Sequence, residues 1–290
     1  MQELQDRVAF VTGGASGMGR AMVNSFAAAG MKVVAADIEQ AALDALARDF
    51  EGSNAEVVPM RVDVGDRDAV EAAAARTVET FGKVHVLCNN AGVVVGGRID
   101  EMDYRDWDWV SRVNYDGVIN GIQAFLPRIL DHGEGGHIVN TASGAGHIPV
   151  PGLSIYNTTK YAVVGLSETI HAELAPLNVG VSVLCPGVVK TAIFNSGRNR
   201  PEALQRDRDT SRVAFSATGD PTDEELARME QIMSAALDPA VVGDMVVDAI
   251  RHGDLYIFTH PDIEVSVDQR FERIHSAFAR WRAYRDEHGV

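Results

Sequence analysis

Cysteine is scarce in this sequence, and histidine is not arranged for metal binding. Only Cys88 and Cys185 occur among the 290 residues, and both stand in apolar, strand-like runs. So few thiols argue against a disulfide framework or a cysteine metal site and suit a reducing cytoplasm. The nine histidines show no pair at the spacing of metal ligands, so we expect no metal cofactor.

Positive charge and long apolar runs are also in short supply. Lys and Arg total 26 against 41 Asp and Glu, which leaves a net charge of −15, whereas a nucleic-acid surface needs clustered cations. No apolar run approaches the roughly 20 residues that span a bilayer. The first residues lack the basic and apolar regions of a signal peptide. We therefore expect neither a nucleic acid nor a membrane as a partner.

Short apolar runs alternate with longer helical stretches along most of the chain. Strands are expected at 8–11, 32–36, 55–62, 84–88, 137–141, 180–185 and 255–258. Helices are expected near 17–29, 40–50, 67–81, 104–131, 155–177 and 239–252. Most of the strand runs are continuously apolar, as in strands that are covered on both faces of a parallel sheet. The pattern predicts a single domain over 1–290, with a doubly wound α/β fold and a seven-stranded parallel sheet.

Two segments interrupt this alternation. Residues 192–238 are rich in charge and turn formers, with an apolar island at 213–215, and are predicted to be a substrate lid or a disordered insertion. Residues 262–287 place apolar side chains three and four positions apart, which predicts a C-terminal helical extension. That helix either packs on its own core or forms an interface or pocket cover.

The first strand leads through a glycine-rich loop into a helix. The loop contains Gly13, Ser16, Gly17, Met18 and Gly19. Glycines let the backbone approach a pyrophosphate, and a helix N-terminus supplies free N–H donors. Asp37 follows about 20 positions later, where a carboxylate can bind an adenosine ribose and repel a 2′-phosphate. Neither Ser16 nor Ile38 supplies a cation for such a phosphate, so NAD is the expected cofactor; alternatively, Asp37 only caps a helix.

Several further motifs carry a resemblance to a known family. Asp63 and Val64, the run Asn89-Asn90-Ala91-Gly92, and the run from Pro186 through Gly187 and Val189 to Thr191 join the loop in this pattern, together with Asn114, Ser143, Tyr156 and Lys160. From about residue 5 to 258 the chain resembles the short-chain dehydrogenases/reductases of the shorter type. The resemblance implies a Rossmann-type fold. It places Asp63 and Val64 at the adenine, Asn90, Ala91 and Gly92 beside the cofactor, and the 186–191 segment over the nicotinamide. It makes Asn114, Ser143, Tyr156 and Lys160 a catalytic tetrad, in which Asn114 holds a relay water.

The chemistry of these residue types agrees with that implication. Tyr156 and Lys160 are four apart on a predicted helix and therefore share a face. A neighbouring ammonium, together with a nicotinamide ring, would lower the phenol pKa, so that Tyr156 can remove a hydroxyl proton. Ser143 would hydrogen-bond the substrate oxygen, and Lys160 would also hold the nicotinamide ribose.

Each residue has a structural explanation when taken alone. Ser143 is then a turn former, Asn114 a local helix cap or kink, and Tyr156 a core aromatic. A non-catalytic dinucleotide sensor that binds partners is the alternative from another class, suggested by the charged 192–238 segment and the C-terminal helix.

The expected substrate pocket is bordered by Val93, Val94 and Val95, by the small, apolar segment 144–153, and by the lid after Thr191. This border predicts a neutral, mainly apolar secondary alcohol. Arginines of the lid leave an anionic substrate open, but they alternate with acids and are expected to be solvated. The run 113–121 and the strand 255–258 resemble bacterial lignin Cα-dehydrogenases, which oxidise benzylic alcohols. The family's helices at 104–131 and 155–177 pack against a second subunit, which implies a homo-oligomer, with a tetramer favoured.

Overall fold

The computed structural model describes residues 1–206, 222–223, 227, 231 and 234–290. The apolar island at 213–215 and about half of the predicted lid lie outside these residues. The chain divides into two units, Met1–Thr259 and His260–Val290, and each is described by itself.

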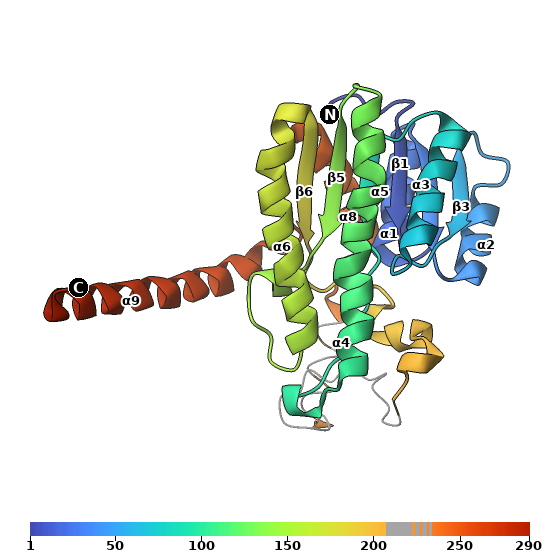
Figure 1. Cartoon of the computed structure of the whole chain (residues 1–290). Coiled ribbons are helices and arrows are strands. Elements are labelled where there is room, and N and C mark those ends of the chain that lie inside the picture. Colours follow the sequence, from blue (N-terminus) through green and yellow to red (C-terminus); the bar gives the residue numbers. More distant parts are fainter. Residues whose placement is uncertain (207–221, 224–226, 228–230, 232–233) are drawn as a thin grey trace. The chain divides into compact units, whose positions relative to one another are not determined.

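The larger unit is built around one parallel sheet, drawn in Figure 1. Its strands are β1 (Val8–Thr12), β2 (Lys32–Asp37), β3 (Val57–Arg61), β4 (Val86–Asn89), β5 (Gly136–Thr141), β6 (Val179–Cys185) and β7 (Tyr256–Phe258). They lie in the order β3-β2-β1-β4-β5-β6-β7, and all neighbours are parallel. Strands β1, β4 and β5 are buried along their whole length, which explains why β1 and β4 are almost entirely apolar. The predicted doubly wound fold is confirmed.

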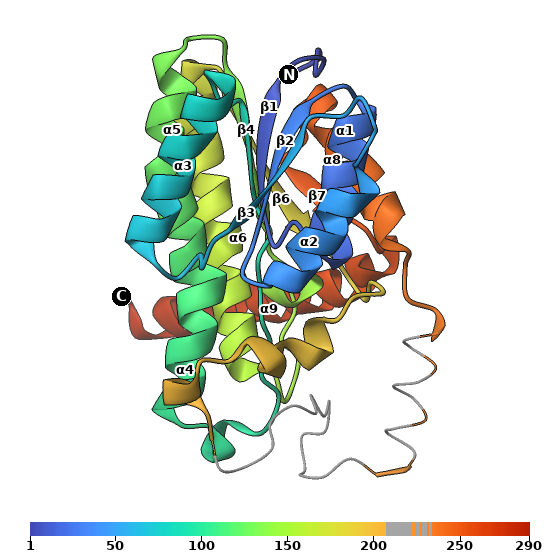
Figure 2. The same cartoon turned by 90° about the vertical axis from the view of Figure 1, so that its right-hand side faces the viewer.

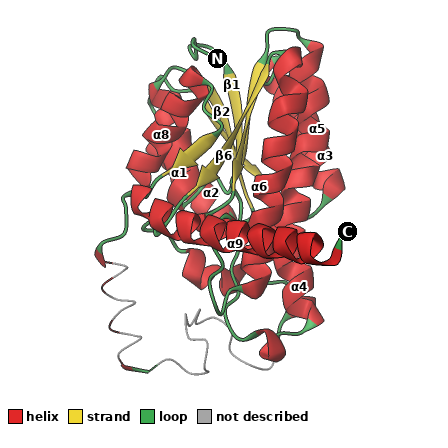
Figure 3. Ribbon diagram, turned by 90° about the vertical axis from the view of Figure 1, so that its left-hand side faces the viewer, coloured by secondary structure: helices red, strands yellow, loops and turns green. Residues whose placement is uncertain are grey.

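Helices cover both faces of this sheet. They are α1 (Gly17–Ala28), α2 (Gln40–Asp49), α3 (Arg67–Phe81), α4 (Tyr104–Ser111), α5 (Gly117–Asp131), α6 (Ser154–Leu174) and α8 (Pro239–His252). Figures 2 and 3 show α1, α2 and α8 on one face and α3, α5 and α6 on the other. Helices α1 and α8 pack closely because Gly243 has no side chain, and a Cβ there would lie 2.6 Å from the Ala21 carbonyl oxygen.

Side-chain caps define where several helices begin. The Asp66 carboxylate accepts from the first-turn amides of α3, and Asp238 does the same for α8, whose first residue is Pro239. Asp103 and Asp106 form a reciprocal capping box at the start of α4. Gly82 and Gly253 end α3 and α8 in the left-handed conformation that glycine adopts without strain.

The predicted helix at 104–131 is helical throughout but not uniform. A π-helical turn at Arg112–Asp116 joins α4 to α5. The Asn114 side chain in this turn exchanges hydrogen bonds with the Val93 backbone, whose N–H donates to Oδ1 (2.8 Å) and whose carbonyl accepts from Nδ2 (2.9 Å). A wider turn that re-aims one side chain is a frequent feature of functional sites.

The smaller unit contains the helix α9 (Glu264–His288), which confirms the predicted C-terminal helix. No residue of α9 is buried, and Phe278 and Trp281 are 61% and 54% exposed. An interface role for this helix stays a prediction. Within the described residues, no helix combines the length and the apolar character that crossing a bilayer requires.

Candidate active site

A cleft of about 1050 Å³ opens at the carboxyl ends of the central strands. Ligands of open α/β sheets bind at this edge, where the strand order reverses on either side of β1 and β4. Most of the predicted site residues line it: Gly13, Ser16, Gly17, Met18, Asp37, Ile38, Asp63, Val64, Asn90, Ala91, Gly92, Tyr156, Lys160, Pro186 and Thr191. The topology therefore gathers residues that are far apart in the sequence into one cavity.

The glycine-rich loop has a backbone shape that lets a phosphate group or another backbone segment approach it closely. Gly13 and Gly17 have φ angles of +63° and +52°, which side-chain-bearing residues rarely adopt. Gly19 does not line the cleft, but it sets the loop's shape, because a Cβ at that position would lie 2.0 Å from the Gly13 carbonyl oxygen. The N-terminus of α1 then begins at Gly17, directly beside the cleft.

Asp37 ends β2 and faces the cleft with a buried carboxylate. Its Oδ2 accepts from the Ala15 amide of the glycine loop (3.1 Å), and its Oδ1 accepts from the Glu39 amide (3.1 Å). Burial raises the pKa of the Asp37 carboxyl group, and these two amides act in the opposite direction. Besides linking the loop to β2, the oxygens retain lone pairs that a ribose hydroxyl can use.

The end of β4 is fastened to the same loop. The Thr12 hydroxyl oxygen accepts from the amides of Asn90 (2.8 Å) and Ala91 (3.0 Å), while Asn90 Nδ2 donates to the Thr12 carbonyl (2.9 Å). The Asn90 Oδ1 atom is buried and has no described hydrogen-bond partner. On the next wall, Asp63 pairs with Arg112 (3.0 Å) and holds the 63–65 turn by accepting from Gly65.

Tyr156 and Lys160 lie on one face of α6, as their spacing predicted. The Lys160 Nζ atom lies 5.4 Å from the centroid of the Tyr156 ring and donates to the Thr141 carbonyl at the end of β5 (2.8 Å). Ser143 follows β5 and shares a side-chain hydrogen bond with Tyr156. Its own hydroxyl also accepts from the Ala145 amide (3.1 Å). The candidate acid–base residue, its hydrogen-bonded serine and a buried cation are therefore brought together.

In the chain by itself, burial acts against the predicted lowering of the Tyr156 pKa. Burial raises the phenol pKa, and the hydrogen bond with Ser143 offsets this rise only in part. The Lys160 ammonium donates to the Thr141 carbonyl and is itself desolvated. The same burial lowers the pKa of Lys160 from 10.5 to about 8.

Asn114 lies behind the cleft rather than on its wall. Its Nδ2 donates to Val93 and, at 3.3 Å, to the Thr159 hydroxyl, so it connects the loop after β4 to α6. A Cβ at Gly92 would lie 3.5 Å from Asn114 Oδ1 and 3.6 Å from Lys160 Nζ, which places both polar groups around one small glycine. The structural interpretation of Asn114 as a helix kink and the predicted role beside Lys160 are thus compatible.

The segment after β6 closes one side of the cleft. Thr191 lies against the glycine loop, since a Cβ at Gly17 would meet its side chain at 3.0 Å. Gly187 and Val189 lie behind the wall, where the Gly187 amide donates to the Thr259 hydroxyl (3.2 Å) and Val189 forms a bridge with Leu237. Ser196 was not predicted, because no local pattern marks it; it lines the cleft and bonds the Val94 backbone through its hydroxyl (3.1 and 3.2 Å).

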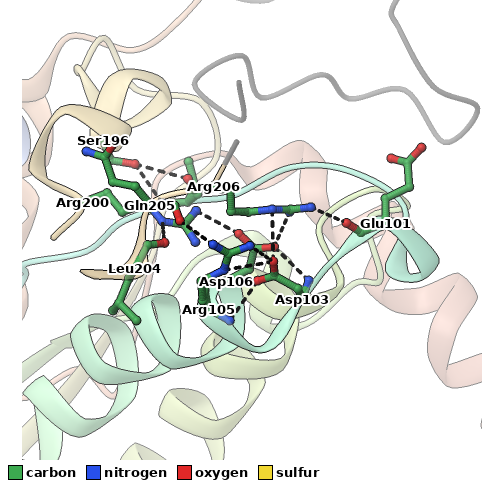
Figure 4. Close-up of polar contacts among 10 residues, drawn as sticks. Glu101, Asp103, Arg105, Asp106, Ser196, Arg200, Leu204, Gln205 and Arg206 are labelled. Carbon is green, nitrogen blue, oxygen red and sulfur yellow. Dashed lines mark hydrogen bonds and ion pairs between the residues drawn. The ribbon is translucent and has the colours of Figure 1, made fainter. Parts of the chain in front are cut away.

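The described lid arginines are held in ion pairs, contrary to the expectation that they are solvated. Figure 4 shows Arg200 and Arg206 converging on Asp106 at the start of α4. Asp106 is fully buried, Arg200 is 7% exposed, and their ion pair measures 2.8 Å. The Arg200 guanidinium also lies over the Trp109 ring, 5.1 Å from its centroid, and Trp109 lines the cleft.

A third lid arginine corrects the expectation that no cation stands near Asp37. Arg198 lines the cleft together with Asp37, but its guanidinium pairs with the Glu39 carboxylate (2.5 Å). Glu39 and Arg198 are separated by more than half the chain, so no local sequence pattern indicates this pair.

The predicted border at 144–153 does not form part of this cleft within the described residues. Leu153 packs with Val94 in a small apolar cluster that includes Tyr156, and Gly144–Gly146 form a tight turn against α6. Val93 does line the cleft, whereas Val95 packs beneath it against Trp109. The apolar border therefore comes from the loop after β4 and from the start of the lid.

One histidine cluster lies away from the cleft and was not visible in the sequence. The rings of His85 and His132 are 4.7 Å apart, beside Glu134. His85 Nδ1 accepts from a β1 amide, and its Nε2 lies 3.2 Å from the Glu134 carboxylate. His132 Nδ1 accepts from the Glu134 amide, while its Nε2 donates to a backbone carbonyl. Because both rings use their lone pairs internally, this cluster does not offer a metal site.

Comparison with known proteins identifies the class to which this fold and cleft belong. The family model described as short chain dehydrogenase matches residues 7–202. A crystal structure of a short chain dehydrogenase/reductase from Burkholderia phymatum in complex with NAD is 40% identical, with a TM-score of 0.86 over 96% of this chain and 97% of that one. The chain belongs to the short-chain dehydrogenase/reductase family and is an oxidoreductase.

Two further relatives come from Sphingobium sp. strain SYK-6. A protein named C alpha-dehydrogenase is 32% identical over 94% of this chain and 87% of its own length. The crystal structure of the apo form of LigO is 35% identical, with a TM-score of 0.79 over 99% of this chain and 97% of that one. The predicted resemblance to the family and to Cα-dehydrogenases is confirmed.

Proposed function

We propose that this chain is an NAD-dependent dehydrogenase that interconverts a neutral, mainly apolar secondary alcohol and its ketone. The observation that carries the proposal is one cleft that is lined by Tyr156 and Lys160 as well as by the glycine loop and Asp37. Tyr156 and Lys160, the two polar side chains that proton transfer needs, are both present, which favours a catalyst over the alternative of a dinucleotide sensor.

NAD is the cofactor for which the cleft residues are suited. The close-approach glycines, the helix N-terminus and the Asp37 carboxylate match a pyrophosphate and an adenosine ribose. When bound, NAD would supply the acceptor for a hydride from the carbinol carbon. Asp63 and Val64 would border the adenine, and Thr191 with Pro186 would cover the nicotinamide end.

Tyr156 and the residues around it transfer the proton and position the substrate. Tyr156 takes the hydroxyl proton of the alcohol, or returns it to the alkoxide in the reverse direction. Ser143, already hydrogen-bonded to Tyr156, orients the substrate oxygen. The Lys160 ammonium lies 5.4 Å from the centroid of the Tyr156 ring and, together with the positive nicotinamide ring of bound NAD, would favour the ionised phenol. Asn114 supports this group from behind.

Apolar side chains in the lining of the cleft suit an apolar substrate. They are Val93, Trp109, Val113 and Ile193. The described lid arginines do not offer a free cation to an anion there, because Arg198 pairs with Glu39 and Arg200 with Asp106. Because a similar protein is named C alpha-dehydrogenase, a benzylic alcohol is the first candidate.

The test follows NADH absorbance with a panel of benzylic alcohols, cyclic alcohols, hydroxysteroids, sugars and hydroxy acids. We expect a benzylic or cyclic alcohol to be preferred, and kcat/KM with NAD to exceed that with NADP at least tenfold, about 1.4 kcal/mol. A tenfold preference for a sugar or a small hydroxy acid would overturn the substrate class, and equal use of NADP would overturn the cofactor.

Tyr156→Phe tests the mechanism, because it removes the transferable proton and keeps the ring. Turnover should fall at least about a hundredfold, while NADH binding and the melting temperature stay unchanged. Tyr161→Phe on the same helix is the matched control and should retain activity. Near wild-type turnover by the Tyr156 variant would contradict the proposed mechanism.

Three further proposals accompany this function. Residues 192–238 act as the substrate lid of a single catalytic domain, supported by Ala192, Ile193 and Ser196 on the cleft wall. The enzyme assembles as a homotetramer. Its two unpaired, buried cysteines suit a cytoplasmic location.

A further inference from the structure

Glu39 lies at the adenosine end of the cleft and meets the lid there. It stands two residues after Asp37, and its amide donates to the Asp37 carboxylate (3.1 Å). Its own carboxylate accepts from Arg198 Nη2 (2.5 Å) and Nε (3.3 Å), and from Asn199 Nδ2 (2.9 Å). Asp37, Glu39, Arg198 and Asn199 all line the same cleft. The ion pair therefore joins the end of β2 to the lid beside the predicted ribose position.

The position of Arg198 is fixed by further hydrogen bonds. Its Nη1 donates to the carbonyls of Ala192 (3.1 Å) and Asn195 (2.7 Å), so the guanidinium stays within its own segment. The Arg198 and Glu39 side chains are 32% and 29% exposed, which leaves the pair only partly screened by water. The bond from Arg198 also lowers the Glu39 pKa, so the carboxylate stays ionised at neutral pH.

This arrangement bears on the difference between NAD and NADP, which is one phosphate on the adenosine ribose. Arginine is the side chain best suited to bind such a phosphate, because its planar guanidinium matches two phosphate oxygens. Among the described residues that line the cleft, the cations are Arg198 at the Asp37 end and Lys160 at the other end. A free Arg198 would therefore favour NADP.

We infer that Glu39 is a second determinant of cofactor preference, which neutralises and holds Arg198 so that this arginine does not receive a 2′-phosphate. The inference rests on the proposed function, since it concerns the cofactor of that same cleft. Asp37 repels the phosphate directly, whereas Glu39 acts by occupying the nearby cation, Arg198, that could attract it.

The experiment measures the dissociation constants of NADH and NADPH by energy transfer from protein tryptophan to the dinucleotide, without any substrate. Glu39→Ala should strengthen NADPH binding relative to NADH by about tenfold, because the Arg198 guanidinium is then released from Glu39 and can bind the phosphate. The double variant Glu39→Ala/Arg198→Gln should lose this gain. Asp37 stays in place throughout.

Arg61 provides a matched control. It donates to the Ile38 carbonyl (3.3 Å) and so lies near the same strand end, but it does not line the cleft. Glu39→Ala/Arg61→Gln should keep the full gain. Thermal melting of each variant checks that the fold is retained, which we expect because Glu39 and Arg198 are only half-buried.

The outcomes separate this inference from the proposed function. If the wild type prefers NADH but Glu39→Ala leaves the ratio unchanged, the inference is wrong and the proposed cofactor stands. The inference is also wrong if the gain survives loss of Arg198 or disappears with loss of Arg61. A wild type that binds neither dinucleotide, or prefers NADPH, would overturn both.

Discussion

Lys160 is a cation held in a nearly dry site, 3% exposed, with a pKa lowered by burial from 10.5 to about 8. Between those two pH values the unfolded chain binds more protons at this residue than the folded chain does. Stability must therefore rise with pH through that window, and the full cost of burying the ammonium is present below about pH 8. A shift of this size corresponds to at most about 3 kcal/mol.

Lys160→Met should accordingly raise the free energy of unfolding at pH 7, by about 1–3 kcal/mol, while it removes activity. The gain should shrink as the pH approaches 10.5, where the pKa of the unfolded lysine lies. Urea unfolding at pH 7 and about pH 9.5 measures both values. Lys83→Met, at an exposed lysine, should show no such gain. A Lys160 variant less stable than the wild type at pH 7 would mean that the bond to Thr141 outweighs desolvation.

Which site residues can be predicted depends on how local their geometry is. Tyr156 and Lys160 meet because a helix brings residues four apart onto one face, so spacing alone suffices. Arg198 and Arg200 resemble solvated charges in the sequence because their acidic partners, Glu39 and Asp106, are distant along the chain. Their burial is set by tertiary contacts that no local pattern records.

At the scale of elements, the first turn of α4 holds the start of the lid. The Asp106 carboxylate accepts from the Asp103 amide, from Arg200 and from Arg206, so its two oxygens serve as cap and ion-pair partner at once. Arg105 adds a bond to the Gln205 carbonyl (2.8 Å). These contacts keep the described end of the lid against α4, beneath the Trp109 wall of the cleft.

Asp106→Ala would leave the buried Arg200 without its carboxylate partner and would leave Arg206 with only its longer ion pair to Asp103 (3.5 Å). We expect a loss of about 3–5 kcal/mol in the free energy of unfolding, since breaking one side of a buried ion pair costs that much, and faster proteolysis near residues 200–206. Chemical denaturation and limited trypsin digestion measure the two effects. Asp100→Ala, which removes an exposed partner of Arg98, is the control and should change neither. Equal behaviour of both variants would show that the Asp106 cluster contributes little.

The sequence predicted where the helices and strands lie along the chain better than it predicted their detailed geometry. The observed strands lie within a few residues of the predicted runs, because apolar strands between polar turns carry their own signal. For the π-helical turn at Arg112–Asp116, the sequence offered only the interpretation of Asn114 as a helix cap or kink, because the bond between Asn114 and the Val93 backbone joins residues 21 positions apart.

At the scale of the whole molecule, the predicted assembly depends on which side chains of α6 stay exposed in one chain. The helix predicted at 155–177 was expected to pack against a second subunit, but a single chain already buries its Val163 and Val164. Leu166 and Ile170 pack in part against the same core. The exposed face of α6 lies around Gly165, where a Cβ would meet no atom within 4 Å.

We expect light scattering at micromolar concentration to give a mass near four times 31.2 kDa. Gly165→Arg should dissociate the assembly, because it places a charge on the exposed α6 face without a clash in the protomer. Asp44→Arg on α2, across the sheet, is the control and should leave the mass unchanged. A wild-type mass near 31.2 kDa would overturn the predicted assembly.

The strand order also governs how the protein must fold. β1 lies inside the sheet, between β2 and β4, and its Ala9 pairs with Val86 of β4, so one edge of β1 stays unpaired until a much later part of the chain arrives. Such distant pairings close long loops before they gain contacts, which makes folding slow and leaves an edge exposed to aggregation meanwhile. Since the cleft needs both halves of the sheet, a dinucleotide that binds it can stabilise only the completed fold. The supply of cofactor would then influence how much of the newly made chain survives as enzyme.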